Sequence, residues 1–174
     1  MKILYTFCYL LCSCLGIFAQ GIDTVSSINI TDKFIELYNS NNLGEAVEMF
    51  HYPTTYSSNE LIMDKSAVKN ILNLFHEEFG YFEKDDTTMT GIEVYQVSVG
   101  GGDIQYWTKY PYSLTIDIQG TFKNKGSGFI SFRICKIKNN PEIREVLFSL
   151  PSSNKDAETI IQKIHNKMIL LIQE

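Results

Sequence analysis

The segment YSLTIDIQGTF, residues 112–122, is followed after KNKGS by GFISFRICKI, residues 128–137. Apolar residues occupy every second position of the first segment, which is the period of a β-strand with one face on a core. The connection contains Asn124 and Gly126, residue types that accept left-handed turn geometry. This pattern predicts a β-hairpin at the centre of a strand-rich region.

Strand patterns continue on both sides of this hairpin. Residues 92–99 are rich in β-branched residues, residues 104–110 resume the pattern after a glycine turn, and residues 142–150 end at Pro151. Consecutive strands joined by short turns pair as an antiparallel meander. Residues 91–150 therefore predict a curved antiparallel sheet.

Helical periodicity is found toward the two ends of the chain. A first helix is expected to begin near Thr31, and a second, short helix is expected to follow Asn42. The strongest pattern runs from Asp64, a good N-cap, to Gly80, which suits the position just past a helix end. A last helix is expected from Ser153 onward. The order of elements predicts an α+β fold in which helices from both ends of the chain cover the sheet.

Composition sets bounds on the domain and on its partners. The chain has 174 residues, enough for one domain with a real core, and 44% of them are apolar, which excludes a disordered chain. The formal net charge of −5 argues against nucleic-acid binding, because nucleic-acid-binding proteins normally carry a basic face. We expect no nucleic-acid partner and no cofactor.

The first residues predict a processing signal. Lys2 supplies a positive start, residues 3–18 are almost uninterrupted apolar sequence, and Ala19 is a small residue suited to cleavage. We therefore expect a signal peptide over residues 1–19. The mature chain is then a single domain over residues 20–174, exported to the periplasm or secreted.

An alternative processing route is lipidation. The segment LCSC, residues 11–14, resembles a bacterial lipoprotein signal, and modification of Cys14 would anchor the chain to a membrane. Of the four cysteines, only Cys135 lies beyond the signal, so the mature chain is expected to have no internal disulfide and no cysteine-based zinc site. Cys135 itself is expected to be a small buried apolar residue.

One order of elements runs through most of the chain. A helix, a short helix, the junction FHYP at residues 50–53, a short strand, a strong helix and a long meander follow one another. This order, over residues 31–150, resembles the nuclear transport factor 2-like superfamily. The resemblance implies a cone of curved sheet around a long helix, to which residues 153–174 add an extra C-terminal helix. The superfamily includes isomerases, cyclases, dehydratases and non-catalytic binding domains, so the resemblance implies no single activity.

Two residues are candidates for catalysis. His51 follows the short helix and, in the resembled fold, lies near the mouth of the cone, where an imidazole would suit a general base. The alternative is that His51 caps the end of that helix. Asp117 alternates with the apolar face of its strand, so it is a solvated residue if the outer face of the sheet is open and a buried acid if that face is covered.

The other histidines point to no metal site. His76 and His165 are far apart in the chain, and no H-x-x-x-H or H-E-x-x-H spacing occurs. His76, Glu77 and Glu78 face away from the apolar stripe of their helix and are expected on a solvated face.

Aromatic residues supply candidates for ligand binding, because a ring with a polar tip suits a pocket lining. Tyr106 and Trp107 cannot share one face of a regular strand, so one of the two lies outside any pocket. The complete candidate set is Tyr56, Tyr95, Tyr106, Trp107 and Tyr110.

Three functions remain open on sequence grounds. The first is an exported, non-catalytic domain that binds a small ligand or a protein partner in or beside a cone-shaped pocket. The second is an isomerase or lyase with His51 or Asp117 as its base and a tyrosine as hydrogen-bond donor. The third is a module that forms homodimers through its sheet, with the last helix involved.

Overall fold

The structure is a computed structural model that describes residues 24–56, 61–85, 93–101, 113–137 and 140–173. Its helices are α2 (Thr24–Asn39), α3 (Leu43–Ala46), the 3-10 turn η1 (Val47–Met49), α4 (Lys65–Phe79) and α6 (Ala157–Gln173). Its strands are β1 (Thr54–Tyr56), β2 (Leu61–Met63), β3 (Phe82–Lys84), β4 (Val94–Gly100), β5 (Ser113–Phe122), β6 (Gly126–Ile137) and β7 (Asn140–Pro151). The expected signal segment with Cys14 and the strand expected over 104–110 lie outside the described residues.

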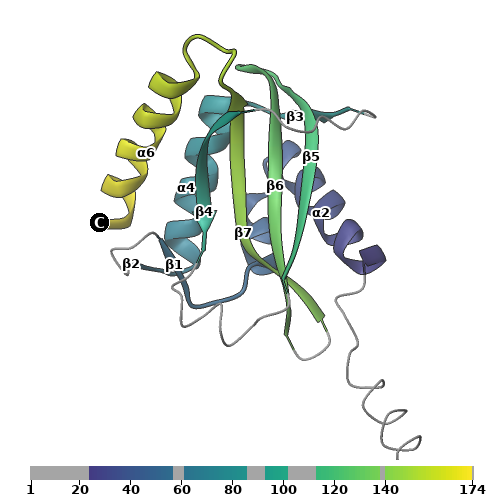
Figure 1. Cartoon of the computed structure of the whole chain (residues 1–174). Helices are drawn as coiled ribbons and strands as arrows, with labels where there is room; N and C mark the ends of the chain where they lie inside the picture. The colour runs from purple at the N-terminus through teal and green to yellow at the C-terminus, as the bar shows by residue number, and fades with distance from the viewer. Residues whose placement is uncertain (1–23, 57–60, 86–92, 102–112, 138–139, 174) are drawn as a thin grey trace, which may run out of the picture.

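Five strands form one curved antiparallel sheet in the order β3-β5-β6-β7-β4 (Figure 1). β5 and β6 pair from Ser113↔Cys135 to Phe122↔Gly126, so the predicted hairpin is confirmed. β1 and β2 form a separate two-stranded sheet. The α+β class with an antiparallel sheet is therefore present.

The edge strand β3 was not predicted, because residues 81–90 are polar enough to indicate a plain connection. Phe82 pairs with Phe122, and Lys84 pairs with Gly120. A Cβ atom on Gly120 would lie 2.2 Å from the carbonyl oxygen of Glu83, so only glycine lets the two backbones approach this closely. The Phe82 ring lies 4.8 Å from the Phe122 ring and buries this short strand on the core. A strand of three residues is too short for an alternation pattern to reveal it.

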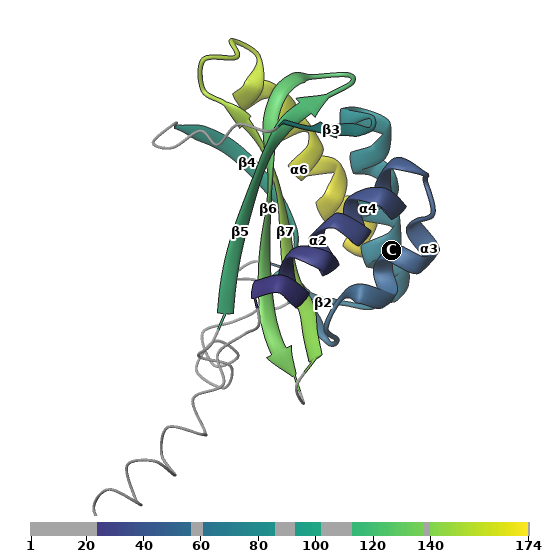
Figure 2. The same cartoon turned by 90° about the vertical axis from the view of Figure 1, so that its right-hand side faces the viewer.

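The long helices all lie on one side of the sheet, as Figure 2 shows for α2, α4 and α6. Between them and the sheet the core consists largely of aromatic rings. Phe148 of β7 lies 4.7 Å from Phe75 and 5.4 Å from Phe79, both on α4. Phe34 of α2 lies 5.3 Å from Phe132 of β6. These rings have no exposed surface, so the space between α2, α4 and the sheet is filled.

The opposite face of the sheet changes character from edge to centre. Asp117 on β5 is exposed and lies opposite Ser131 on β6, which in turn lies opposite Leu147 on β7. Leu147 is buried although the described helices lie on the other side, and so is Ser149 two residues further on. Val146 of β7 faces the core, because it pairs with the buried Phe132.

The helix ends confirm some predictions and correct others. The Asp64 side chain caps α4 by accepting a hydrogen bond from the Ala67 backbone N–H at 2.8 Å, and Gly80 ends the helix with φ 75°. The first helix begins at Thr24, not near Thr31, whose hydroxyl donates to the Ile28 carbonyl. A buried threonine that bonds to its own helix is compatible with a helix interior. The short helix α3 begins directly after Asn42, as predicted, but the Asn42 side chain makes no cap hydrogen bond.

The last helix, α6, packs against α4 and β4. It begins at Ala157, four residues later than expected, after a turn in which the Asn154 side chain accepts from the Asp156 backbone N–H. The helix buries one apolar stripe, to which Ala157, Ile161 and Ile164 belong. No helix within the described ranges has the length and apolar character needed to cross a membrane.

Candidate functional site

The C-terminal turns of α6 carry more apolar side chains than one helix face can hold. Residues 168–172 read Met-Ile-Leu-Leu-Ile, and five consecutive residues of a helix point in all directions around its axis. Met168 is fully buried against the core, whereas Leu170 is 64% exposed. Part of this apolar surface therefore faces away from the domain.

The surface next to this apolar turn is hollowed between α4 and α6. A hollow of about 500 Å³ is lined by Asn70, Asn73 and Leu74 of α4 and by Lys167, Leu170 and Leu171 of α6. A second hollow, of about 540 Å³, shares Asn70 and Leu171 and continues to Ile62 and Ile172. We call the two together the α4–α6 groove.

The two walls of the α4–α6 groove differ in chemistry. Asn70, Asn73 and Glu77 recur at helical spacing on α4 and present amides and a carboxylate. The facing turn of α6 presents aliphatic side chains, Leu170 and Leu171 among them. Amide groups can both donate and accept hydrogen bonds, so such a groove suits an occupant with one apolar and one polar side.

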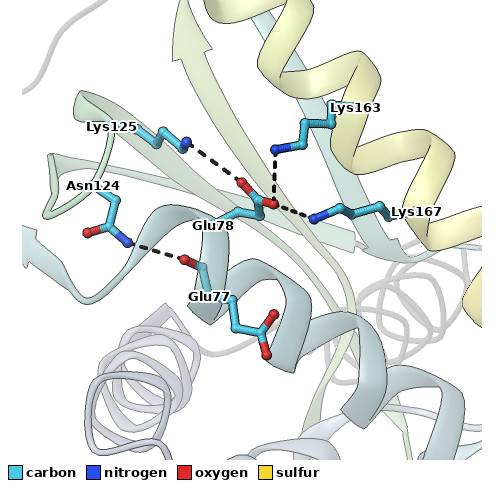
Figure 3. Close-up of polar contacts among 6 residues, drawn as sticks. All are labelled: Glu77, Glu78, Asn124, Lys125, Lys163 and Lys167. Atoms are coloured by element: carbon cyan, nitrogen blue, oxygen red, sulfur yellow. Dashed lines mark hydrogen bonds and ion pairs between the residues drawn. The ribbon is translucent and has the colours of Figure 1, made fainter.

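A cluster of charges lies at one end of the α4–α6 groove. Glu78, on the last turn of α4, is ion-paired with Lys167 at 2.6 Å and Lys163 at 3.6 Å, both on α6, and with Lys125 at 3.7 Å from the β5–β6 turn (Figure 3). The hydrogen bond from Lys167 is the main cause that lowers the pKa of the Glu78 carboxyl group below its usual value. We call these four residues the Glu78 cluster.

The sequence missed this cluster. Glu78 was expected on a solvated face, but its side chain is only 14% exposed. The helical pattern correctly placed Glu78 away from the apolar stripe of α4. It could not show that α6 packs beside the side of α4 that carries Glu78. The available signal was Lys163 and Lys167, one turn apart on the last helix, which need a negative partner if their side is covered.

His51 is paired with a carboxylate. Its Nδ1 lies 2.7 Å from Oε2 of Glu142, and its backbone N–H donates to the carbonyl of Ile143 on β7. The imidazole therefore contacts the start of β7, and its position just past η1 does not make it a simple helix cap. A histidine oriented by a carboxylate is a chemically competent base.

Asp117 and His51 are not brought together. Asp117 is exposed in the middle of β5, on the face opposite the helices, which confirms the solvated alternative. His51 lies beside β7, next to the parallel bridge between Phe50 and Ile143. The two candidates therefore do not form a single catalytic constellation.

A second buried charge group lies at an irregularity of the sheet. The β6–β7 register shifts between Arg133 and Ile134, at the position of Arg144 and Glu145. Glu145 is ion-paired with Arg133 at 2.8 Å, and burial raises the pKa of the Glu145 carboxyl group. Arg144 donates to the carbonyl of Pro53 at 3.1 Å and so links β7 to the segment after His51. This group was not predicted, because charged residues inside a strand pattern normally face water.

The aromatic candidates are mostly beyond what the structure describes. Tyr106, Trp107 and Tyr110 lie outside the described residues, and the side chain of Tyr56 is not described. Tyr95 is 39% exposed near the start of β4, on the same face as Val97. The binding role of this set stays a prediction.

Cys135 is buried, as expected, and burial raises the pKa of its thiol to about 11. Within the described residues no group of three or more histidine, cysteine, aspartate or glutamate side chains is placed to hold a metal ion. Comparison of the chain with protein families, with curated proteins and with solved structures finds no match. The candidate site therefore rests on the geometry of this chain.

Proposed function

We propose that this chain is an exported, non-catalytic binding domain that holds an amphipathic segment of a partner protein in the α4–α6 groove. The observation that supports it best is Leu170, a leucine 64% exposed on the rim of a groove whose other wall is polar. Burying such a side chain is worth roughly 1.5–3 kcal/mol. A partner that covers Leu170 and Leu171 together would therefore gain a useful share of its binding energy there.

The wall on α4 favours a peptide-like occupant over a purely apolar one. Asn70 and Asn73 can exchange hydrogen bonds with polar groups along one side of a bound segment. The aliphatic turn of α6 would contact its other side. Recognition of an amphipathic helix in an apolar groove is a recurring mode of protein–peptide binding.

The wider setting of this proposal is the one expected from the sequence. We propose that residues 1–19 are removed on export and that the curved sheet is a nuclear transport factor 2-like cone. In that case binding takes place beside the cone and not within it, because the described core between α2, α4 and the sheet is filled by aromatic rings.

The test is site-specific photo-crosslinking in the cells that produce the protein. A benzophenone amino acid replaces Leu170 in one variant and Val25 in a matched control, because Val25 is 66% exposed but lies on α2, away from the groove. We expect a discrete adduct with another protein from position 170 only. This adduct should disappear when Asn73→Arg is added, because the larger side chain narrows the groove. Equal labelling at both positions, or an adduct with a second copy of this chain, would contradict the proposed partner.

The pairing of His51 with Glu142 favours a second candidate function, an isomerase or lyase with His51 as its base. In that case His51→Gln would abolish turnover of a carbonyl substrate while leaving the fold intact. Retention of the full activity by His51→Gln would remove this candidate.

A further inference from the structure

We propose that the Glu78 cluster is also a binding site for a doubly charged oxyanion, such as a phosphoryl group or a pair of carboxylates. This site lies at the groove of the proposed function and adds an anion to its occupant. Only the statement that the anion is part of that occupant rests on the proposed function. Its three cationic side chains come from two distant parts of the chain, the β5–β6 turn and α6 (Figure 3).

The charge of the cluster is unbalanced. One carboxylate, Glu78, faces three ammonium groups, those of Lys125, Lys163 and Lys167. The neighbouring carboxylate, Glu77, points away from the lysines in Figure 3. The cluster therefore holds an excess of two positive charges, on a chain whose formal net charge is −5. A dianion would neutralise this excess.

The hydrogen-bond geometry is also incomplete. Lys167 is at full hydrogen-bond distance from Oε1 of Glu78, 2.6 Å. Lys163 stands 3.6 Å from that same oxygen, and Lys125 stands 3.7 Å from the other, beyond the usual N–H···O range. Within the described part of the chain the ammonium groups of Lys163 and Lys125 make no hydrogen bond. The two ammonium groups therefore lie beside opposite oxygens of the Glu78 carboxylate and keep donor capacity for a ligand.

The burial of Lys125 makes this arrangement unlike an ordinary surface ion pair. Its side chain is only 20% exposed, whereas that of Lys163 is 61% exposed. A partly buried ammonium group loses part of its hydration, which raises the free energy of its charged form. Repulsion from the two neighbouring cations raises it further. An anion that bridges Lys125 and Lys163 would offset both costs. Because Lys167 also lines the α4–α6 groove, such an anion would sit at the end of the groove.

The experiment uses the mature chain with ¹³C-labelled lysine side chains, titrated with inorganic phosphate above its second pKa. Sodium chloride at equal ionic strength is the control for screening. We expect saturable shifts of the ε-carbon resonances of Lys125, Lys163 and Lys167. Lys33, which is ion-paired with Glu36 on α2, should not shift.

Variants then test the assignment. Lys125→Gln and Lys163→Gln should each weaken phosphate binding by about fivefold, the effect of one charge at contact distance in water. Lys33→Gln should leave binding unchanged. Absence of saturation, or shifts of equal size at Lys33, would overturn the site even if a variant failed to fold. The lysine resonances report on phosphate, and crosslinking from position 170 reports on the partner protein. Either result can be negative while the other is positive, so the two proposals are tested separately.

Discussion

The two sides of α4 are built differently. Toward α2 and the sheet, its side chains Phe75 and Phe79 are fully buried among other rings. Toward α6, packing is complete at Met168 and then opens into a groove at Leu170 and Leu171. One helix therefore supports a closed core on one side and an open surface on the other. This difference separates the residues that hold the fold from those available to a partner.

The largest expected effect lies on the closed side. Phe148→Ala removes a ring that contacts Tyr38, Phe75 and Phe122, and it should lower the free energy of unfolding by about 3–5 kcal/mol. Urea denaturation followed by circular dichroism measures this loss. The matched variant is Phe129→Ala on the same sheet, whose side chain is only half-buried on the other face. An equal loss for both variants would mean that the aromatic core is not the main source of stability.

A smaller effect is expected at the buried charge group of the sheet. Because burial raises the pKa of Glu145 in the folded state, the folded chain binds more protons than the unfolded chain between the two pKa values. The Glu145 contribution to stability is therefore present at low pH and is lost as pH rises through the folded pKa. As the pH rises through the folded pKa, the free energy of unfolding of Glu145→Gln should increase relative to that of the original chain. Urea denaturation at several pH values measures this difference. A relative stability that falls with pH would contradict this account.

The Glu78 cluster should have a local effect. Glu78→Gln removes the shared partner of three lysines, so α6 should open more often from α4, while the global free energy of unfolding falls by about 1 kcal/mol or less. Amide hydrogen exchange measures the faster opening of α6, with α2 as the internal reference. Because the pKa of Glu78 is lowered, its contribution is present above the unfolded pKa and is lost as pH falls through the folded pKa. Unchanged exchange in α6 would show that the cluster does not hold this helix.

The smallest effect on stability is expected in the groove. Leu170→Ser replaces a mostly exposed side chain and should change the free energy of unfolding by about 0.5 kcal/mol or less. Partner binding should nevertheless be strongly reduced, because the aliphatic turn of α6 loses a largely exposed apolar side chain. Val25→Ser is the control with similar exposure on α2. A large loss of stability in Leu170→Ser would place this residue in the core and not in a binding surface.

The same comparison explains what the sequence predicted. Period-2 alternation in 113–122 and the helical stripe between Asp64 and Gly80 are local patterns, and both elements are present. The α+β class follows from their order. Features that depend on packing between distant segments were missed. The pairing of β3 with β5 requires a residue without a side chain at Gly120, and the groove is formed only because α6 lies beside α4.

The candidate site was harder to predict for the same reason. The sequence singled out residues by their chemical type, and so it named Asp117, which lies on β5, and His51, which lies beside the start of β7. Leu170 and Glu78 are candidates for binding only because of the residues that surround them in the folded chain. An aliphatic residue in a helix normally indicates core, and a glutamate on a polar flank normally indicates solvent.

The most direct test of the central claim compares the two sides of α4 in one spectrum. The purified chain, with labelled leucine and isoleucine methyl groups, is mixed with the partner segment identified by crosslinking from position 170. We predict shifts at Leu170, Leu171 and Ile172, with Ile71 and Ile130 in the core unchanged. Shifts at Ile71 and Ile130 with none at the groove would contradict the account, because the occupant would then lie between the helices and the sheet.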